Sequence, residues 1–204
     1  IEINLLFQSL GAALEAPMQA ITFLGSELFF LFVLPVIYWC INATMGLHLG
    51  LLLMVSTSLY STLKIAFHDP RPYWLDPGVR AYAEETSFGL PSGHAQIAFS
   101  VWGMLANSIR RWWAWFIAII LIVMIGVSRL YLGVHFPHDT ILGWLIGGLL
   151  LWLVVRFWKP VTEWLKKMRF GQQIIASFLS SMVIILLYLI PFVWLKSTNW
   201  QPPL

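Results

Sequence analysis

The chain has 204 residues, of which 59% are hydrophobic and only 10% are charged, with a formal net charge of +3. Soluble domains are about 45–50% apolar and about 25% charged, so this composition excludes a soluble globular domain and a disordered chain. The single cysteine, Cys40, excludes an intramolecular disulfide. An integral membrane protein remains, with the lipid bilayer as its surroundings and no indication of nucleic acid as a partner.

Long uncharged runs predict the membrane spans. Residues 28–63 contain no Asp, Glu, Lys or Arg, which makes about 54 Å of helix, or nearly two crossings of the hydrocarbon core. A polar stretch at 42–46 supplies the turn between them. We therefore expect an all-α fold, a polytopic integral membrane helix bundle of about six transmembrane helices near residues 21–41, 47–67, 92–109, 112–130, 139–158 and 173–195.

No hydrophilic domain or long linker interrupts these segments, so residues 1–204 are predicted to form a single membrane domain. Residues 3–20 are apolar but contain Pro17 and scattered polar groups. We expect residues 1–20 to form a short segment that lies in the membrane interface rather than a further span.

The distribution of cations predicts the orientation. The loops after the first, third and fifth predicted helices hold seven cations: Arg110, Arg111, Arg156, Lys159, Lys166, Lys167 and Arg169. The opposite side holds five: Lys64, Arg71, Arg80, Arg129 and Lys196. The positive-inside rule places the side with seven in the cytoplasm, which predicts a protein of the cell membrane whose other side faces outward.

Polar residues are costly inside a membrane, and three clusters of them fall on the outward side. They occupy residues 64–72, 91–94 and 128–139. Each lies at an end of a predicted helix, and an even number of crossings separates them, so the fold should bring them to one membrane face. We expect these clusters to form one site.

The residue types in the clusters favour a phosphate ligand. Pro91 and Ser92 are typical of a helix start, where free N–H groups bind anions, and Gly93 permits close backbone approach. Arg71 and Arg129 provide guanidinium groups that match phosphate oxygens in bidentate geometry. A third cation, Lys64, adds positive charge to the same site.

Two histidines can supply acid, base or nucleophilic chemistry near neutral pH. His94 follows the helix start, and His135 precedes the fifth predicted span. Asp139 stands four residues after His135, a spacing at which a helical turn lets its carboxylate bind one imidazole nitrogen. That contact would fix the tautomer and direct the other nitrogen at a phosphorus atom.

The pattern resembles the signature of the type 2 phosphatidic acid phosphatase (PAP2) superfamily over residues 64–139. Its three parts are Lys64, six residues, then Arg71-Pro72; Pro91-Ser92-Gly93-His94; and Ser128-Arg129, five residues, then His135, three residues, then Asp139. Every signature position is filled, and the flanking predicted helices match as well.

The resemblance implies a lipid phosphatase that needs no metal and no cofactor. It implies His135 as the nucleophile, Asp139 as its orienting partner and His94 as the acid that protonates the leaving oxygen. The implied phosphate ligands are Lys64, Arg71, Ser92, Gly93 and Arg129.

Several residues near the clusters lie outside the signature. Glu27 is an intramembrane carboxylate that could bind a nearby Arg or Lys, or simply reach the interface. Tyr73 and Trp74 begin the loop 73–90, which we expect to shape the headgroup entrance. His138 could contact solvent or headgroups. In the same loop, a solvated surface is expected for Arg80, Glu84 and Glu85.

The substrate is open among undecaprenyl diphosphate, phosphatidate, phosphatidylglycerophosphate and sphingoid phosphates, and an outward site slightly favours the carrier-lipid diphosphate. One alternative is a phosphotransferase of the same fold. A vanadium-haloperoxidase-like enzyme is a second, although those enzymes are soluble. A non-catalytic lipid transporter is a third, but it would not need two histidines and an aspartate together. The oligomeric state is not predicted.

Overall fold

The computed structural model describes residues 1–83 and 85–197, and these residues form helices without any strand. The elements of the first half are α1 (Glu2–Gln8), the 3₁₀ turn η1 (Ala12–Leu14), α2 (Glu15–Phe23), α3 (Glu27–Val36), the π turn η2 (Ile37–Ile41), α4 (Ala43–Phe67) and α5 (Pro72–Leu75). Those of the second half are α6 (Gly93–Ile97), the π turn η3 (Ala98–Trp102), α7 (Gly103–Ile109), α8 (Trp112–Tyr131), α9 (Pro137–Lys166) and α10 (Phe170–Ser197).

The helices have the lengths and apolar compositions of membrane spans. Within residues 1–83 and 85–197, four are long and apolar enough to cross a bilayer: Ala43–Leu75, Trp112–Tyr131, Pro137–Lys166 and Phe170–Trp194. A fifth crossing is possible if the pair Ala12–Phe23 and Glu27–Ile41, bent by 47°, counts as one span. The predicted all-α membrane bundle is therefore confirmed, whereas the predicted count of about six spans stays a prediction.

The observed helix ends differ from the predicted ends for physical reasons. The segment predicted as one helix over 21–41 is broken after Phe23, and Ser26 starts a new helix because its Oγ accepts the backbone N–H of Phe29 at 3.1 Å. The helix predicted over 139–158 continues to Lys166. Charged residues mark where a chain leaves the hydrocarbon core, but they do not end a helix.

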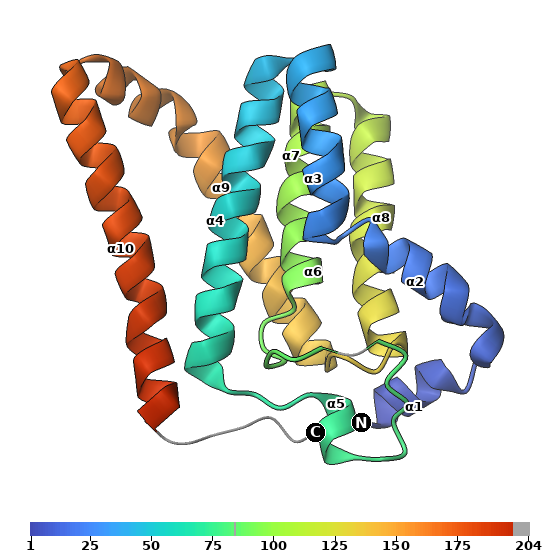
Figure 1. Ribbon diagram of the computed structural model, residues 1–204. Helices are drawn as coiled ribbons and strands as arrows, with labels where there is room; N and C mark the ends of the chain where they lie inside the picture. The colour runs from blue at the N-terminus through green and yellow to red at the C-terminus, as the bar shows by residue number, and fades with distance from the viewer. Residues whose placement is uncertain (84, 198–204) are drawn as a thin grey trace.

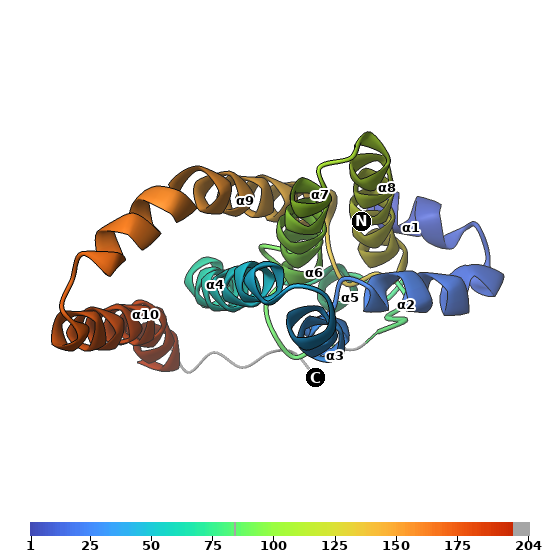
Figure 2. The same cartoon turned by 90° about the horizontal axis from the view of Figure 1, so that it is seen from above.

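A central helical segment, α6 to α7, forms the core of the bundle. It lies among α3, α4, α8 and α9 in both views (Figures 1 and 2). Its buried apolar side chains are Ala95, Ile97, Ala98, Val101, Met104 and Ala106. Close packing against α9 depends on glycine, since a Cβ on Gly147 would lie 2.5 Å from the carbonyl oxygen of Gln96.

The loop between α4 and α6 and the loop between α8 and α9 lie at the same end of the bundle, beside α1 and α5 (Figure 1). The predicted convergence of the polar clusters on one end is therefore observed. Helix α10 packs along α4 and otherwise stands apart from the central helices (Figure 2).

The α6–α9 contact predicts a difference between two glycines. Gly147→Ala should destabilise the protein by about 1–3 kcal/mol, because its Cβ meets backbone that cannot move freely. Gly50→Ala, also in a helix, meets nothing within 4 Å and should be neutral or slightly stabilising. Thermal unfolding of both variants in detergent checks this, and equal melting temperatures would contradict the packing.

Candidate active site

His135 and Asp139 meet at the start of α9. Pro137 begins the helix, and the Asp139 carboxylate turns back to cap it: Oδ2 accepts the backbone N–H of Phe136 at 2.8 Å. The same Oδ2 lies 3.2 Å from Nδ1 of His135, and both side chains are buried. Because a carboxylate oxygen accepts, the proton is on Nδ1 of a neutral His135, and Nε2 carries a free lone pair.

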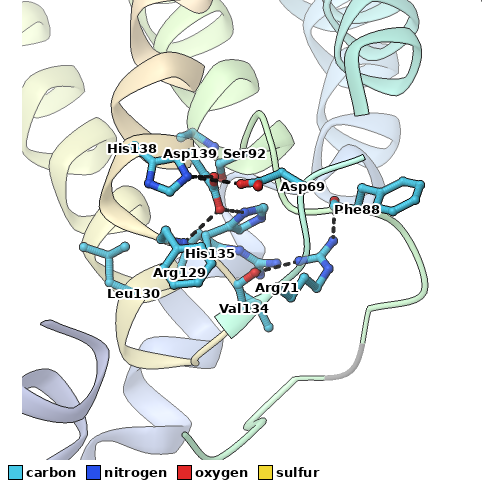
Figure 3. Close-up of polar contacts among 12 residues, drawn as sticks. Asp69, Arg71, Phe88, Ser92, Arg129, Leu130, Val134, His135, His138 and Asp139 are labelled. Atoms are coloured by element: carbon cyan, nitrogen blue, oxygen red, sulfur yellow. Dashed lines mark hydrogen bonds and ion pairs between the residues drawn. The ribbon is translucent and has the colours of Figure 1, made fainter. Parts of the chain in front are cut away.

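His138 lies on the other side of Asp139 (Figure 3). Its Nε2 is 3.1 Å from Oδ1 of Asp139 and 3.1 Å from Oδ2 of Asp69, and its side chain is 62% exposed. The ligand atoms of these three residues lie within 4.8 Å of one another, a spacing that could hold a cation. The absence of a metal in the mechanism therefore stays a prediction.

Arg71 ties the two loops together (Figure 3). Its side chain is completely buried, and its guanidinium donates to the carbonyl oxygen of Val134 at 2.8 Å and to that of Phe88 at 3.1 Å. It also donates to the carbonyl and hydroxyl oxygens of Ser87 at 2.5 and 3.0 Å. One cation thus positions both the loop before α6 and the chain leading to His135.

Lys64 and Arg129 complete a group of three buried cations with Arg71. Nζ of Lys64 donates to Ser87 Oγ at 2.9 Å. The guanidinium of Arg129 donates to the hydroxyl of Thr22 at 3.1 Å and to the Glu85 carboxylate at 2.5 Å.

Glu85 provides the anion for these cations. Its carboxylate lies 2.5 Å from Arg129 and 3.7 Å from Arg71, and its side chain is 28% exposed. The expectation of a solvated surface was therefore wrong for Glu85. Arg80 is exposed as expected, and Glu84 lies outside the described residues.

The same charges set the protonation of the loop residues. Burial alone would raise the pKa of Glu85, but Arg129, Arg71 and Lys64 together lower it below its ordinary value. Burial, followed by the positive charges of Arg71 and Arg129, lowers the pKa of His135 well below its ordinary value. His135 is therefore neutral at physiological pH, which is the form that can act as a nucleophile.

His94 lines a cavity of about 230 Å³ beside these cations. The cavity is lined by Gly25, Glu27, Tyr60, Lys64, Glu85, Ser87, Gly93, His94 and Ile97. Ser92 is buried and caps α6, since its Oγ accepts the N–H of Ala95 at 3.4 Å. The structure therefore gathers the predicted phosphate-binding residues around one end of the bundle, with His94 and Lys64 facing one hollow.

Two predicted residues have partners that the sequence did not indicate. For Glu27 the sequence left open an ion pair with Arg or Lys or a position at the interface, and its carboxylate accepts hydrogen bonds from the hydroxyls of Tyr60 and Thr57. Tyr73 exchanges hydrogen bonds with the backbone of Glu85: its hydroxyl donates to the carbonyl at 2.9 Å and accepts the N–H at 3.2 Å.

Trp74 lies in the same loop and packs edge to face against Phe88, with 6.3 Å between ring centroids. Tyr73 therefore holds Glu85 in place, and Trp74 packs within the loop that was predicted to shape the entrance.

Asn4 is a supporting residue that sequence analysis missed. Its side chain is fully buried, and its amide donates to the carbonyl oxygens of Leu130 and His135, each at 2.9 Å. It therefore holds the chain on both sides of the α8–α9 turn. No sequence signal could reveal it, because the contact joins residues more than a hundred positions apart.

Comparison with known proteins identifies the family. The sequence profile of the PAP2 superfamily matches residues 45–163. An undecaprenyl-diphosphatase of Sulfolobus acidocaldarius is 32% identical over 112 residues, which are 54% of this chain and 54% of that protein. Phosphatidylglycerophosphatase B of Bacillus subtilis is 32% identical over 106 residues, 46% of this chain and 52% of the relative. The chain spans about half the length of these curated relatives.

Two solved structures resemble most of the bundle. A transmembrane PAP2-type phosphatidylglycerolphosphate phosphatase from Bacillus subtilis superposes with a TM-score of 0.69 and 29% identity, over 83% of this chain and 86% of that one. LpxE from Aquifex aeolicus gives a TM-score of 0.65 and 25% identity, over 74% and 93%. The chain is thus a membrane-embedded helical protein, and it belongs to the PAP2 superfamily.

The Asn4 contacts predict an effect far from the signature. Asn4→Ala removes one side-chain donor from two carbonyl groups, those of Leu130 and His135, so the loop before His135 should loosen, and turnover should fall about tenfold. Ser9→Ala, which removes only a local hydrogen bond to Leu6, is the matched control. Phosphate release by both variants checks this, and unchanged turnover in Asn4→Ala would contradict a positioning role.

Proposed function

We propose that this protein is an integral membrane phosphatase that hydrolyses a lipid phosphate or diphosphate through a phosphohistidine. The observation that carries the proposal is the convergence of three buried cations with a neutral, carboxylate-bound His135 and with His94. Membership of the PAP2 superfamily supports it. The names of the relatives, an undecaprenyl-diphosphatase and a phosphatidylglycerophosphatase, support a lipid substrate.

The first chemical step transfers the phosphoryl group to the protein. Nε2 of His135 attacks phosphorus, the bond between phosphorus and the leaving oxygen breaks, and His94 gives its proton to that oxygen. Asp139 stabilises the positive charge that develops on the imidazole, because it accepts from Nδ1. Lys64, Arg71 and Arg129 bind the phosphoryl oxygens, with Ser92 and the Gly93 amide beside them, and offset the charge of the transition state.

The second step releases phosphate. His94, now neutral, takes a proton from water as the water oxygen attacks phosphorus. The bond between phosphorus and Nε2 breaks, and inorganic phosphate leaves with His135 regenerated. A phosphotransferase would differ only here, with a lipid hydroxyl in place of water.

The position of the site suits a substrate held in the bilayer. The cations lie at the ends of α4 and α8, so a headgroup can reach them while its apolar chain stays in the hydrocarbon. Seven cations gather in the turn between α7 and α8, in the second half of α9 and in the turn after it, and they favour a cytoplasmic location for that end. This supports a site on the outer face of the cell membrane.

The mechanism predicts that His135→Ala abolishes activity. Without the nucleophile, phosphate release should fall by more than about 10³-fold, while the fold survives. The assay uses purified protein in EDTA with undecaprenyl diphosphate, phosphatidate and phosphatidylglycerophosphate. His48→Gln is the control. His48 lies in the first turns of α4, at the opposite end of that helix from Lys64, and its ring packs against Trp158 of α9.

Two outcomes would contradict the mechanism. One is near-normal release by a folded His135→Ala variant. The other is wild-type release that requires added Mg²⁺, because a phosphohistidine mechanism needs no metal and the Asp69, His138 and Asp139 group would then be the first place to look for one.

A further inference from the structure

The cavity that His94 lines also has walls outside the group of three cations. Lys64 and Glu85 line it together with His94, and Ile97, which follows His94 by three residues on α6, lines it as well. A Cβ added to Gly25 would lie 3.3 Å from the carbonyl oxygen of His94, so the start of α3 packs directly against this part of α6. Glu27, two residues later, contributes its side chain to the same wall.

Glu27 is a carboxylate with spare hydrogen-bonding capacity. Tyr60 and Thr57 both donate to Oε1, the latter at 3.1 Å, and within the described residues Oε2 receives no hydrogen bond. No described cation forms an ion pair with Glu27. Lys64, the nearest cation lining the cavity, instead donates to Ser87 and lies over the Tyr60 ring, 5.4 Å from its centroid.

The proposed chemistry determines which part of a substrate meets this carboxylate. Since His94 protonates the leaving oxygen, that oxygen must lie at His94. The atoms bonded to it then lie in the same cavity, whose lining also includes Gly25, Glu27, Tyr60 and Ile97. Glu27 therefore faces the first atoms of the leaving group rather than the phosphoryl group itself.

We infer that Glu27 is a specificity-determining residue that selects lipid phosphate monoesters whose leaving alcohol carries a hydrogen-bond donor, a hydroxyl or an ammonium, on the carbon next to the ester carbon. The inference rests on the proposed function and names its substrate class. Phosphatidylglycerophosphate, 1-acyl lysophosphatidate and sphingoid phosphates have this chemistry, whereas phosphatidate, whose neighbouring oxygen is acylated, does not. A diphosphate does not, because its leaving group is a second phosphate, and two negative groups in one small cavity repel each other.

Part of this wall lies outside the region that defines the family. The family match covers residues 45–163, whereas Gly25 and Glu27 precede it. The residues that bind phosphate and the residue that recognises the leaving group therefore lie in separate parts of the chain, linked in space through Tyr60.

The test compares substrates that differ at one atom. Wild-type protein and Glu27→Gln are assayed in EDTA with 1-acyl lysophosphatidate, which has a hydroxyl at the neighbouring carbon, and with its 2-deoxy analogue, which has hydrogen. Sphingosine 1-phosphate supplies the ammonium arm, and farnesyl diphosphate supplies the diphosphate arm. Glu15→Gln, a carboxylate change on α2 outside the cavity, is the matched control.

The expected result is a change in selectivity and not a general loss of activity. The ratio of kcat/KM for the 2-hydroxy over the 2-deoxy lipid should fall about tenfold in Glu27→Gln, as expected for loss of a charge-assisted hydrogen bond. The kcat/KM for sphingosine 1-phosphate, relative to the 2-deoxy lipid, should fall at least as much, and the kcat/KM for farnesyl diphosphate should stay unchanged or rise. If the ratio falls for only one of the two donor-bearing substrates, the donor of that substrate is the one recognised.

Other results would overturn the inference. Parallel loss on all four substrates would mean that Glu27 only supports Tyr60, and unchanged ratios would mean that it does not meet the substrate. If Glu27→Gln does not fold, Glu27→Asp replaces it in the test. Its side chain is one methylene shorter, so the carboxylate lies farther from the substrate, and the variant must show the same loss of selectivity. Absence of phosphate release from every lipid by the wild-type protein would instead overturn the proposed function, and this assignment with it.

Discussion

Three positive charges are buried at one end of this helix bundle, and a membrane protein can hold them there only if anionic or dipolar groups surround them. Carbonyl groups of two loops accept from Arg71, and the carboxylate of Glu85 lies against Arg129. A phosphate can offset the same charges with more oxygens, so it can take the place of the carboxylate on the guanidinium groups. The loop that carries Glu85 therefore supplies an anionic group where the proposed phosphate would bind.

The rest of the structure positions these charges. α4 and α8 bring a cation each to the same end, and α6 lies between them, close to α9 because Gly143 and Gly147 leave room for its backbone. The capping contact that starts α9 also orients His135, so one carboxylate, that of Asp139, serves both the fold and the nucleophile.

Local spacing and charge were enough to predict the helical membrane bundle and the contact of His135 with Asp139, because both depend on residues close in sequence. The support from the N-terminal segment could not be predicted, since the contacts of Asn4 arise only in the folded chain. Glu85 was misjudged for the same reason: a loop glutamate is ordinarily solvated, and only the folded structure brings it to Arg129. The length of an apolar stretch also does not show whether it forms one continuous helix, because a capping residue such as Ser26 can start a new helix within it.

The central claim is that His135 carries the phosphoryl group between two displacements. The most direct measurement mixes purified protein with a lipid phosphate labelled at phosphorus, quenches the reaction in alkali, in which phosphohistidine survives, and locates the label by mass spectrometry. The account predicts a transient label on the imidazole of His135 that forms and decays at rates compatible with turnover. Rapid release of labelled phosphate with no labelled protein at any time, or a label on a different residue, would contradict it.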